Sequence, residues 1–312
     1  MTPRDHGGGL DAAIARFGGT RTGWLDLSTG INPVPYPVGD LPTDAWTALP
    51  DHAAQQRLLD AARRFWRVPD TAAVLAAPGA SSLIARIPLL RAPAQVDIPG
   101  PTYNEHGAAF HAGGWSVSKG GSARVLVHPN NPDGRLWSRT EALAGDPRLL
   151  VIDESFCDVA PGDSLIALSA RPGTLVLKSF GKFWGLAGLR LGFAIGDPTL
   201  ISVLAEALGP WPVSGPALTA GARALHDGTW AKTTRGRLTR DSARLDTLME
   251  TRGARGIGGT PLFRLYRVDD AARWQDRLAH GQVWSRIFPY SKTWLRLGLP
   301  GPDRWAQLKA AI

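Results

Sequence analysis

The chain has 312 residues, 44% of them hydrophobic and 20% charged, a composition typical of a globular protein with one large domain and a smaller one. A single cysteine, Cys157, excludes an internal disulfide framework and favours a reducing cytoplasm. The apolar runs, such as residues 149–152, are too short to span a bilayer, and the glycine-rich start lacks the apolar core of a signal peptide. We therefore expect a cytoplasmic location and no membrane partner.

The formal net charge of +8 raises the question of nucleic-acid binding. The basic residues are scattered, however, and they form neither a long run nor a patch interleaved with aromatic residues. We interpret the excess as compositional bias with solvated arginines, which predicts no nucleic-acid partner. A basic site for a phosphorylated small molecule is compatible with the same charge.

Strands and helices are predicted to alternate through the first two thirds of the chain. The first 40 residues, rich in glycine and proline, indicate an extended arm. Leucine, alanine and phenylalanine at helical spacing predict an amphipathic helix over 53–66. Short apolar stretches bounded by turn residues then predict buried strands over 72–76, 95–98, 123–127, 149–152 and 174–177, with helices such as 81–90 and 141–144 between them. This alternation predicts an α/β fold with a mainly parallel central sheet and helices on both faces.

The pattern changes after Gly196. Helices are predicted over 200–208, 216–226 and 230–251, followed by strands over 262–268 and 293–297 with a helix between them. We interpret this part as a smaller α+β domain. The predicted division is an N-terminal arm over 1–35 that packs on the small domain and the active site, a large domain over 36–208 and a small domain over 209–312.

The most distinctive motif, residues 179–192 (SFGKFWGLAGLRLG), follows a predicted buried strand directly. Its Lys182 has three aromatic neighbours in the sequence, Phe180, Phe183 and Trp184. An apolar setting favours the neutral amine that Schiff-base chemistry needs. Ser179 and Arg190 can both reach a phosphate, Arg190 through its two-pronged guanidinium. The alternative is a solvated loop lysine without a chemical role.

Two further motifs lie where predicted strands end, the edge at which open α/β sheets form their sites. Gly79, Ala80 and Ser81 stand between a strand and a helix, where free backbone N–H groups and a hydroxyl can bind an anion. Tyr103 follows the strand over 95–98 and can stack on a flat heterocycle. Taken alone, these residues are also explained as a helix start and a turn tyrosine.

Asn131 and Asp153 complete the set. Asn131 lies in a turn after the strand over 123–127, where its amide can face a ring oxygen. Asp153 leaves the buried strand over 149–152 and needs a cationic partner, such as a protonated pyridine nitrogen. The five motifs together supply a phosphate cup, a stacking ring, a ring-oxygen donor, a counter-ion and an amine. Pyridoxal phosphate (PLP) requires each of these, and no metal is predicted.

These motifs resemble those of the fold-type I PLP-dependent enzymes, and their order is similar to that of the histidinol-phosphate aminotransferase subfamily. The matching segments are 78–81, 101–103, 130–134, 153–154 and 179–192. The resemblance implies Lys182 as the catalytic residue that binds PLP as a Schiff base and Asp153 as the partner of its pyridine nitrogen. It also implies Tyr103 as the stacking ring, Asn131 at the ring oxygen, and a homodimer. The phosphate is implied to lie at Ala80, Ser81, Ser179 and Arg190.

Two arginines are implied to bind substrate. Arg296, in WLRLG, resembles the family's arginine that holds the anionic group of the substrate, and Arg286 resembles a second arginine position. Surface arginines of the small domain are the alternative.

Three features are similar to the L-threonine-O-3-phosphate decarboxylases of cobalamin biosynthesis. They are residues 6–8 with 27–33 near the start, Phe156 where related aminotransferases usually place a tyrosine, and the motif 294–300. They imply PLP-dependent decarboxylation of L-threonine O-3-phosphate to (R)-1-amino-2-propanol O-2-phosphate, with His6, Asn32, Arg286 and Arg296 as candidate anchors for the substrate's phosphate and carboxylate. The alternatives are an aminotransferase for histidinol phosphate or a related amino acid and, in another class, a PLP-fold regulator.

Two positions depart from the family pattern. Leu49 stands in LPD where related sequences often have a tyrosine that reaches the PLP phosphate of the neighbouring subunit, so that contact is expected to be missing. Ser82 replaces a common acidic residue.

Overall fold

The computed structural model describes residues 6–312, which form two compact units. The larger unit comprises residues 36–131 and 135–232, and the smaller unit comprises 6–35, 132–134 and 233–312. The units therefore divide near residue 232, whereas a boundary at 208/209 is predicted from the sequence. The difference arises because α8 (Gly215–His226) packs closely against α3 (His52–Trp66) of the larger unit. A Cβ at Gly221 of α8 would lie 2.9 Å from the side chain of Leu58 on α3.

The larger unit is built on a mixed β-sheet. Within the described residues this sheet has seven strands in the order β2-β8-β7-β6-β5-β3-β4. Their bounds are β2 Ala73–Ala77, β3 Gln95–Asp97, β4 Ser116–Val117, β5 Ala123–Val127, β6 Leu149–Asp153, β7 Thr174–Ser179 and β8 Gly192–Gly196. β8 runs antiparallel to β2 and β7, and the pairs from β7 to β4 are parallel. The expectation of a mainly parallel sheet is confirmed.

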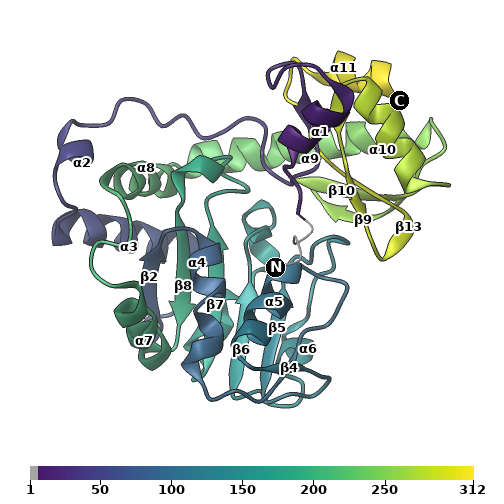
Figure 1. Cartoon of the computed structure of the whole chain (residues 1–312). Helices are drawn as coiled ribbons and strands as arrows, with labels where there is room; N and C mark the ends of the chain where they lie inside the picture. Colours follow the sequence, from purple (N-terminus) through teal and green to yellow (C-terminus); the bar gives the residue numbers. More distant parts are fainter. Residues whose placement is uncertain (1–5) are drawn as a thin grey trace. The chain divides into compact units, whose positions relative to one another are not determined.

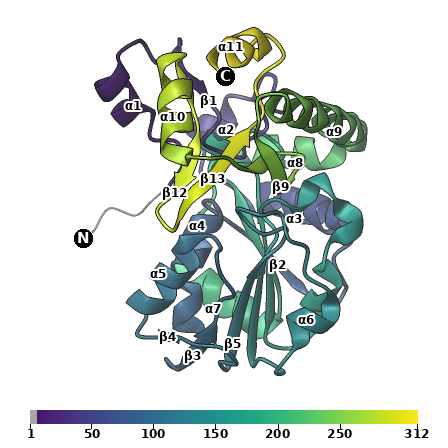
Figure 2. The same ribbon diagram turned by 90° about the vertical axis from the view of Figure 1, so that its right-hand side faces the viewer.

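Both faces of the sheet are covered, which explains why its strands are continuous apolar runs rather than alternating ones. In β6, where every residue is buried, Val151 packs in a cluster with α4 (Ala80–Ile84), α5 (Asn104–Ala112) and α7 (Pro198–Leu208). Leu150 and Ile152 pack on the other face with α6 (Arg139–Leu143). Figure 2 shows α4, α5 and α7 on one side of the sheet and α3 and α6 on the other.

The smaller unit is an α+β structure, as predicted for the C-terminal part of the chain. Among its described residues, a four-stranded antiparallel sheet has the order β12-β13-β10-β9. The bounds are β9 Arg255–Thr260, β10 Phe263–Arg267, β12 Arg286–Phe288 and β13 Ser291–Gly298. Helices α10 (Ala271–His280) and α11 (Trp305–Ala311) belong to the same unit. β1 (Leu25–Asp26), from the N-terminal segment, pairs in parallel with β11 (Val283–Trp284).

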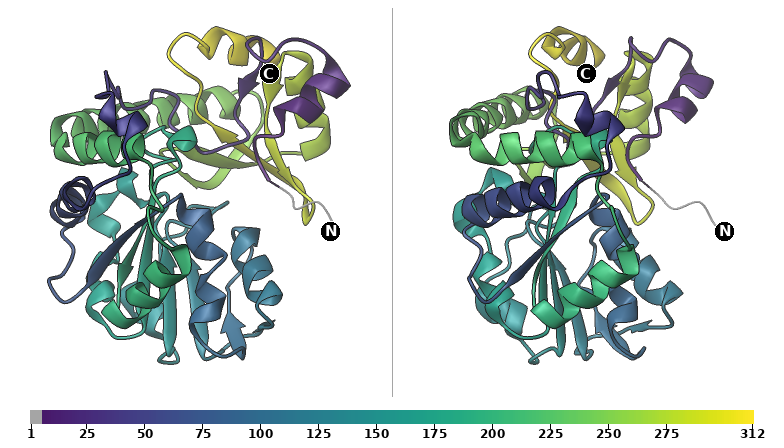
Figure 3. Two further views of the ribbon diagram at one scale, coloured as in Figure 1. Left: turned by 60° about the vertical axis from the view of Figure 1, so that its left-hand side comes forward. Right: turned by 90° about the vertical axis from the view of Figure 1, so that its left-hand side faces the viewer.

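The N-terminal segment is not wholly extended, so the prediction of an extended arm is wrong for α1 (Leu10–Phe17). Figure 3 shows this helix beside α10. Leu10, Ala13, Ile14 and Phe17 recur at helical spacing, and the first two are buried in a cluster with Trp24. The flanking glycines obscure this short apolar stripe in the sequence.

Helix α9 (Gly228–Glu250) is long, at 23 residues, but it is rich in charged and polar residues. Its residues up to 232 belong to the larger unit and the rest belong to the smaller unit. The helix is labelled α9 in Figure 1. Over residues 6–312, no helix is at once long enough and apolar enough to cross a membrane.

Candidate active site

A pocket of about 220 Å³ lies in the larger unit at the carboxyl edge of its parallel strands. Parallel strands end at one edge of a sheet, so the residues that follow β2, β3, β5, β6 and β7 come together there. β8 runs in the opposite direction, so Arg190, which precedes it, reaches the same edge. The predicted cofactor residues in the wall are Ala80, Ser81, Tyr103, Asn131, Asp153, Ser179, Lys182 and Arg190.

Asp153 is a buried carboxylate with three hydrogen bonds. Its Oδ1 accepts from the backbone N–H of Ser155 at 3.0 Å and from the Ser155 hydroxyl at 2.5 Å. Its Oδ2 accepts from Nε2 of His106 at 2.8 Å. Burial by itself raises the pKa of the Asp153 carboxyl, but the bond and charge of His106, together with Ser155, outweigh it and hold the pKa below its ordinary value. The pocket therefore contains an ionised carboxylate.

His106 is a site residue that the sequence reasoning missed. It is 1% exposed and lies in the first turn of α5, three residues after Tyr103, which forms the N-cap of the same helix. The start of α5 therefore places both an aromatic ring in the pocket wall and the hydrogen-bond partner of Asp153. The available signal was a histidine three residues after Tyr103, but its partner is 47 residues away in the sequence.

The anion-binding part of the pocket depends on close packing between Gly79 and Arg190. Nη2 of Arg190 donates to the Ser81 hydroxyl at 3.0 Å, and Nη1 donates to the carbonyl of Ala187 at 3.1 Å. Gly79 has φ +82°, and a Cβ there would lie 2.5 Å from Nη2 of Arg190. Only glycine fits this position without displacing the guanidinium. Ser82, the departure from the family pattern, donates its hydroxyl to the carbonyl of Gly79 at 2.8 Å and stabilises the same turn.

Lys182 follows β7 by three residues and lines the pocket. Its Nζ lies 5.4 Å from the ring centroid of Phe156. Phe180, Phe183 and Trp184 are fully buried, so the chain on both sides of the lysine is anchored in the apolar interior. The structure thus places one aromatic ring near the amine of Lys182 and holds its aromatic sequence neighbours in the interior.

Asn130 connects the wall that carries Tyr103 to the wall that carries Asn131. It is buried, accepts from the Thr102 hydroxyl at 2.6 Å and donates to the carbonyl of Pro101 at 3.0 Å. These bonds fix the loop before α5 to the end of β5. Asn130 thereby supports the fold of the site, whereas Asn131 lines the pocket.

The polar groups of the pocket fit PLP. Its wall offers an ionised carboxylate, a primary amine, an aromatic ring and a guanidinium beside two serine hydroxyls. These groups complement a protonated ring nitrogen, an aldehyde, a flat heterocycle and a phosphate, respectively.

The predicted substrate residues all belong to the smaller unit. Arg286 and Arg296 are cross-strand partners on β12 and β13. Arg296 is 5% exposed and donates through Nη2 to the carbonyl of Ser28 at 2.6 Å. Burial, followed by the charge of Arg286, lowers the pKa of Arg296 to about 10. Two guanidinium groups on adjacent strands provide a cationic site that an anion would stabilise.

His6 and Asn32 have different surroundings. The backbone carbonyl of His6 accepts from Nη1 of Arg286 at 2.7 Å. Asn32 is buried, and its Oδ1 accepts from Nη2 of Arg237 at 2.5 Å. The structure therefore brings His6 to the arginine pair and places Asn32 beside Arg237, a residue to which the sequence pattern drew no attention.

A second group of buried polar residues lies outside the pocket. Potential ligand atoms of His128, Glu154 and Cys157 lie within 4.8 Å of one another. His128 already donates through Nε2 to the carbonyl of Asp163 and accepts through Nδ1 from the backbone of Trp137. Both carboxylate oxygens of Glu154 also accept hydrogen bonds. These contacts describe a hydrogen-bonded structural core.

Residues 118–304 match the family described as aminotransferase class I and II. The chain belongs to this family of PLP-dependent enzymes, which confirms the resemblance inferred from its motifs.

Two relatives match nearly the whole chain. A threonine-phosphate decarboxylase from Sinorhizobium sp is 41% identical, over 96% of this chain and 94% of the relative. One from Pseudomonas aeruginosa is 39% identical, over 99% of this chain and 97% of the relative. The solved structure of histidinol-phosphate aminotransferase from Sinorhizobium meliloti in complex with pyridoxal-5'-phosphate covers 96% of this chain and 92% of its own, with a TM-score of 0.81 and 18% identity. At that identity the likeness shows the fold alone.

Proposed function

We propose that the protein decarboxylates L-threonine O-3-phosphate to (R)-1-amino-2-propanol O-2-phosphate in cobalamin biosynthesis. The observation that carries this proposal is the similarity of nearly the whole chain to two threonine-phosphate decarboxylases. The pocket supports it with a complete set of groups for the cofactor, and the arginine pair of the smaller unit supports an anionic substrate.

When bound, PLP supplies an electron-accepting ring that stabilises negative charge on the substrate's α-carbon. In this proposal the amine of Lys182 would hold the cofactor, and the same amine would deliver a proton to the substrate's α-carbon once carbon dioxide has left. Asp153 would hold the proton on the ring nitrogen, since its lowered pKa leaves the carboxylate ionised. Ser81, Ser179 and Arg190 bind the cofactor's phosphate.

Other residues orient the two molecules. We assign Tyr103 to stacking on the ring and Asn131 to its oxygen, because both line the pocket beside Asp153. Phe156 also lines the pocket, and its phenyl ring cannot donate a hydrogen bond to that oxygen. Asn131 is then the main side-chain donor to the ring oxygen of the cofactor. The resemblance to the decarboxylases implies the same arrangement.

Substrate orientation selects the reaction, because the bond perpendicular to the cofactor ring breaks most easily. A decarboxylase must hold the carboxylate in that direction, whereas an aminotransferase must hold the α-hydrogen there. We assign this task to Arg286 and Arg296, with His6 and Asn32 as further candidates. The cationic character of the arginine pair matches a substrate with both a phosphate and a carboxylate.

The purified protein, incubated with O-phospho-L-threonine, tests the reaction. We expect carbon dioxide release without any 2-oxo acid. Acceptor-dependent transamination with no carbon dioxide would establish the alternative, an aminotransferase. Lys182→Ala tests the lysine assignment separately: it should abolish the visible absorbance of the lysine-linked cofactor, and retention of that absorbance would refute the assignment.

We also propose a homodimer and a cytoplasmic location. The single, buried Cys157 supports the location. For the dimer, the larger unit exposes Trp46 (68%), Leu49 (68%) and Trp211 (53%). Trp46 lies on α2 (Asp44–Thr47), and Trp211 lies in the segment that leads into α8, which packs against α2. Exposed aromatic residues of this kind support a protein interface.

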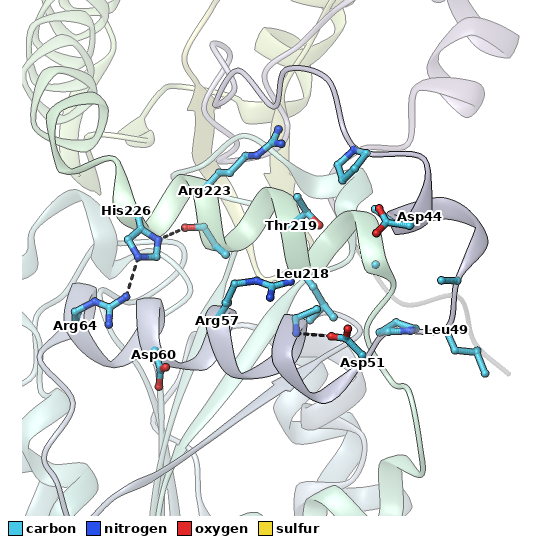
Figure 4. Close-up of a pocket in the computed structure, with 17 residues that line it drawn as sticks. Asp44, Leu49, Asp51, Arg57, Asp60, Arg64, Leu218, Thr219, Arg223 and His226 are labelled. Atoms are coloured by element: carbon cyan, nitrogen blue, oxygen red, sulfur yellow. Dashed lines mark hydrogen bonds between the residues drawn. The ribbon is translucent and has the colours of Figure 1, made fainter.

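The groove beside these residues has balanced charge. It measures about 510 Å³ and is formed by α2, α3 and α8 (Figure 4). Its charged carboxylate and guanidinium residues are Asp44, Asp51, Asp60, Arg57, Arg64 and Arg223. A two-fold interface must complement itself, which a surface with equal numbers of both signs allows.

Light scattering after size-exclusion chromatography tests this face. We expect the wild type to have the mass of two chains and Trp46→Glu to have the mass of one. Leu89→Glu, at a residue that is 70% exposed on a different segment, is the control and should remain dimeric. A dimer that persists in Trp46→Glu would exclude this face as the interface.

A further inference from the structure

Trp184 anchors the loop that carries Lys182. It is fully buried two residues after the lysine, with its ring stacked between Phe180 at 5.1 Å and Trp230 at 5.3 Å, both at an interplanar angle of 12°. Its backbone carbonyl accepts from the N–H of Tyr36 at 2.9 Å. Its indole Nε1 donates to Oδ2 of Asp158 at 3.1 Å. The stacking fixes the plane of the indole, and the bond to Asp158 fixes its rotation within that plane.

Asp158 belongs to a buried ionic cluster, defined here as Glu154, Asp158 and Lys178. Asp158 is 4% exposed, and its Oδ1 accepts from Nε1 of Trp66 at 2.9 Å. Nζ of Lys178 lies 2.5 Å from Oε2 of Glu154 and 3.5 Å from Oδ1 of Asp158. Burial by itself lowers the pKa of Lys178, but the two carboxylates outweigh it and raise that pKa. A charged lysine is therefore held between two carboxylates that would be costly to bury alone.

The cluster joins three segments that line the cofactor pocket. Glu154 follows Asp153 directly at the end of β6, and Lys178 precedes Ser179 directly in β7. Successive side chains of a strand point to opposite sides, so Ser179 lines the pocket while Lys178 lies in the cluster. The third segment is the Lys182 loop, which the cluster reaches through the Trp184 indole. Asp158 itself does not line the pocket.

We infer that Asp158 is a positioning residue of the active site, which fixes the Lys182 loop through the indole N–H of Trp184 while Lys178 supplies its buried counter-ion. This inference rests on the proposed role of Lys182. A loop that is free to rotate about Trp184 would present the amine of Lys182 to the cofactor in more than one geometry. Misplacement of a reacting group by about 1 Å can cost on the order of a hundredfold in rate.

Two substitutions, each of which removes one indole donor to the Asp158 carboxylate, separate a positioning role from a general effect on stability. Trp184→Phe keeps an aromatic ring for stacking but removes the N–H donor to Oδ2 of Asp158. Trp66 lies on helix α3, and Trp66→Phe removes its donor to Oδ1 of Asp158. The variant keeps an aromatic ring against Phe193, whose ring centroid lies 4.9 Å from that of Trp66. Each variant loses one indole bond to Asp158, so a purely structural role predicts the same effect for both.

The measurements are the pH titration of the visible absorbance of the lysine-linked cofactor, kcat, KM and the thermal midpoint. We expect similar losses of thermal stability in the two variants. Trp184→Phe should also shift the titration midpoint and lower kcat by about tenfold or more, with a smaller change in KM, whereas Trp66→Phe should keep kcat within about twofold. Equal kcat values and equal titration midpoints in the two variants would overturn the inference.

Asp158→Asn provides a second test if Trp184→Phe does not fold. The amide retains one oxygen as acceptor but cannot accept from both indoles, so the titration midpoint and kcat should both change. An unchanged midpoint with unchanged kcat would overturn the inference. Failure of the lysine assignment is recognised separately, because Lys182→Ala would then keep the absorbance of the wild type.

Discussion

At the scale of single residues, the site contains pairs of groups that influence each other's charge. His106 and Asp153 form one such pair, 1% and 2% exposed, with a single hydrogen bond of 2.8 Å between them. Arg286 and Arg296 form another, in which like charges lie on adjacent strands. The first pair keeps a carboxylate ionised, and the second needs an anion. Their responses to mutation and pH should therefore differ.

His106→Phe should weaken the ionised form of Asp153, because the carboxylate stays buried but loses its donor. We expect a loss of about 1–3 kcal/mol in unfolding free energy at pH 7, together with weaker cofactor binding. The folded pKa of Asp153 lies below its ordinary value of 3.8, so its stabilising contribution is present above that value and is lost as pH falls through the lowered pKa. Urea unfolding at several pH values should show that the difference in unfolding free energy between wild type and variant becomes smaller as pH falls. His111→Phe, at an exposed position of the same helix, is the control; a gap independent of pH would contradict the prediction.

Arg296→Lys should raise KM for O-phospho-L-threonine by about tenfold or more, because an ammonium cannot reproduce the two-pronged contact of a guanidinium. For the wild type, the pKa of Arg296 near 10 predicts that KM rises as pH approaches 10, where this group loses its proton. Steady-state kinetics between pH 7 and this value test both statements. A KM that is unaffected by the substitution would remove Arg296 from the substrate site.

At the scale of secondary-structure elements, the antiparallel strand β8 has the largest effect on the site, because its direction brings Arg190 to the edge where the other strands end. The sequence predicts β5 with its observed bounds and the neighbouring strands within a residue or two, since buried parallel strands are mostly continuous apolar runs. It does not predict β8, which begins at Gly192 and ends at Gly196, or α1, whose apolar stripe lies between glycines.

The same limit applies to the site. Lys182, Asp153 and Asn131 could be selected because each follows a recognisable strand. His106, Asp158 and Trp184 could not, because their importance lies in contacts with residues far along the chain. Sequence patterns therefore predict which side chains face the pocket better than they predict which side chains hold those in place.

Gly79→Ala tests the contact between the β2–α4 turn and the segment before β8. The added Cβ would lie 2.5 Å from Nη2 of Arg190, at a φ of +82°, so we expect a loss of about 1–3 kcal/mol in stability and weaker PLP binding. Gly188→Ala is the matched control, since it lies in the Lys182 loop with nothing within 4 Å of its Cβ position. Cofactor affinity can be measured by absorbance titration of the apoprotein. Equal affinities in the two variants would contradict the assigned role of this turn.

At the scale of the whole molecule, the net charge of +8 is opposite in sign to the charge of the proposed substrate. A positive potential raises the rate at which an anion reaches a protein, and salt screens it over about 8–10 Å near physiological ionic strength. We expect kcat/KM for O-phospho-L-threonine to fall with added sodium chloride while kcat changes little. Dependence of kcat alone on salt would indicate an effect on the protein's structure rather than on substrate attraction.

The reversed direction of β8 also bears on how this enzyme can change during evolution. The chain leaves the sheet at Ser179 and re-enters it at Gly192 along the same edge, so Lys182 and Arg190 are encoded in one uninterrupted stretch. An insertion within that stretch would displace the amine and the guanidinium together. Insertions in the turn before β6, over residues 144–148, fall at the opposite edge of the sheet and leave both in place. Length variation should therefore accumulate at that opposite edge, while the stretch from Ser179 to Gly192 is inherited as a unit of fixed length.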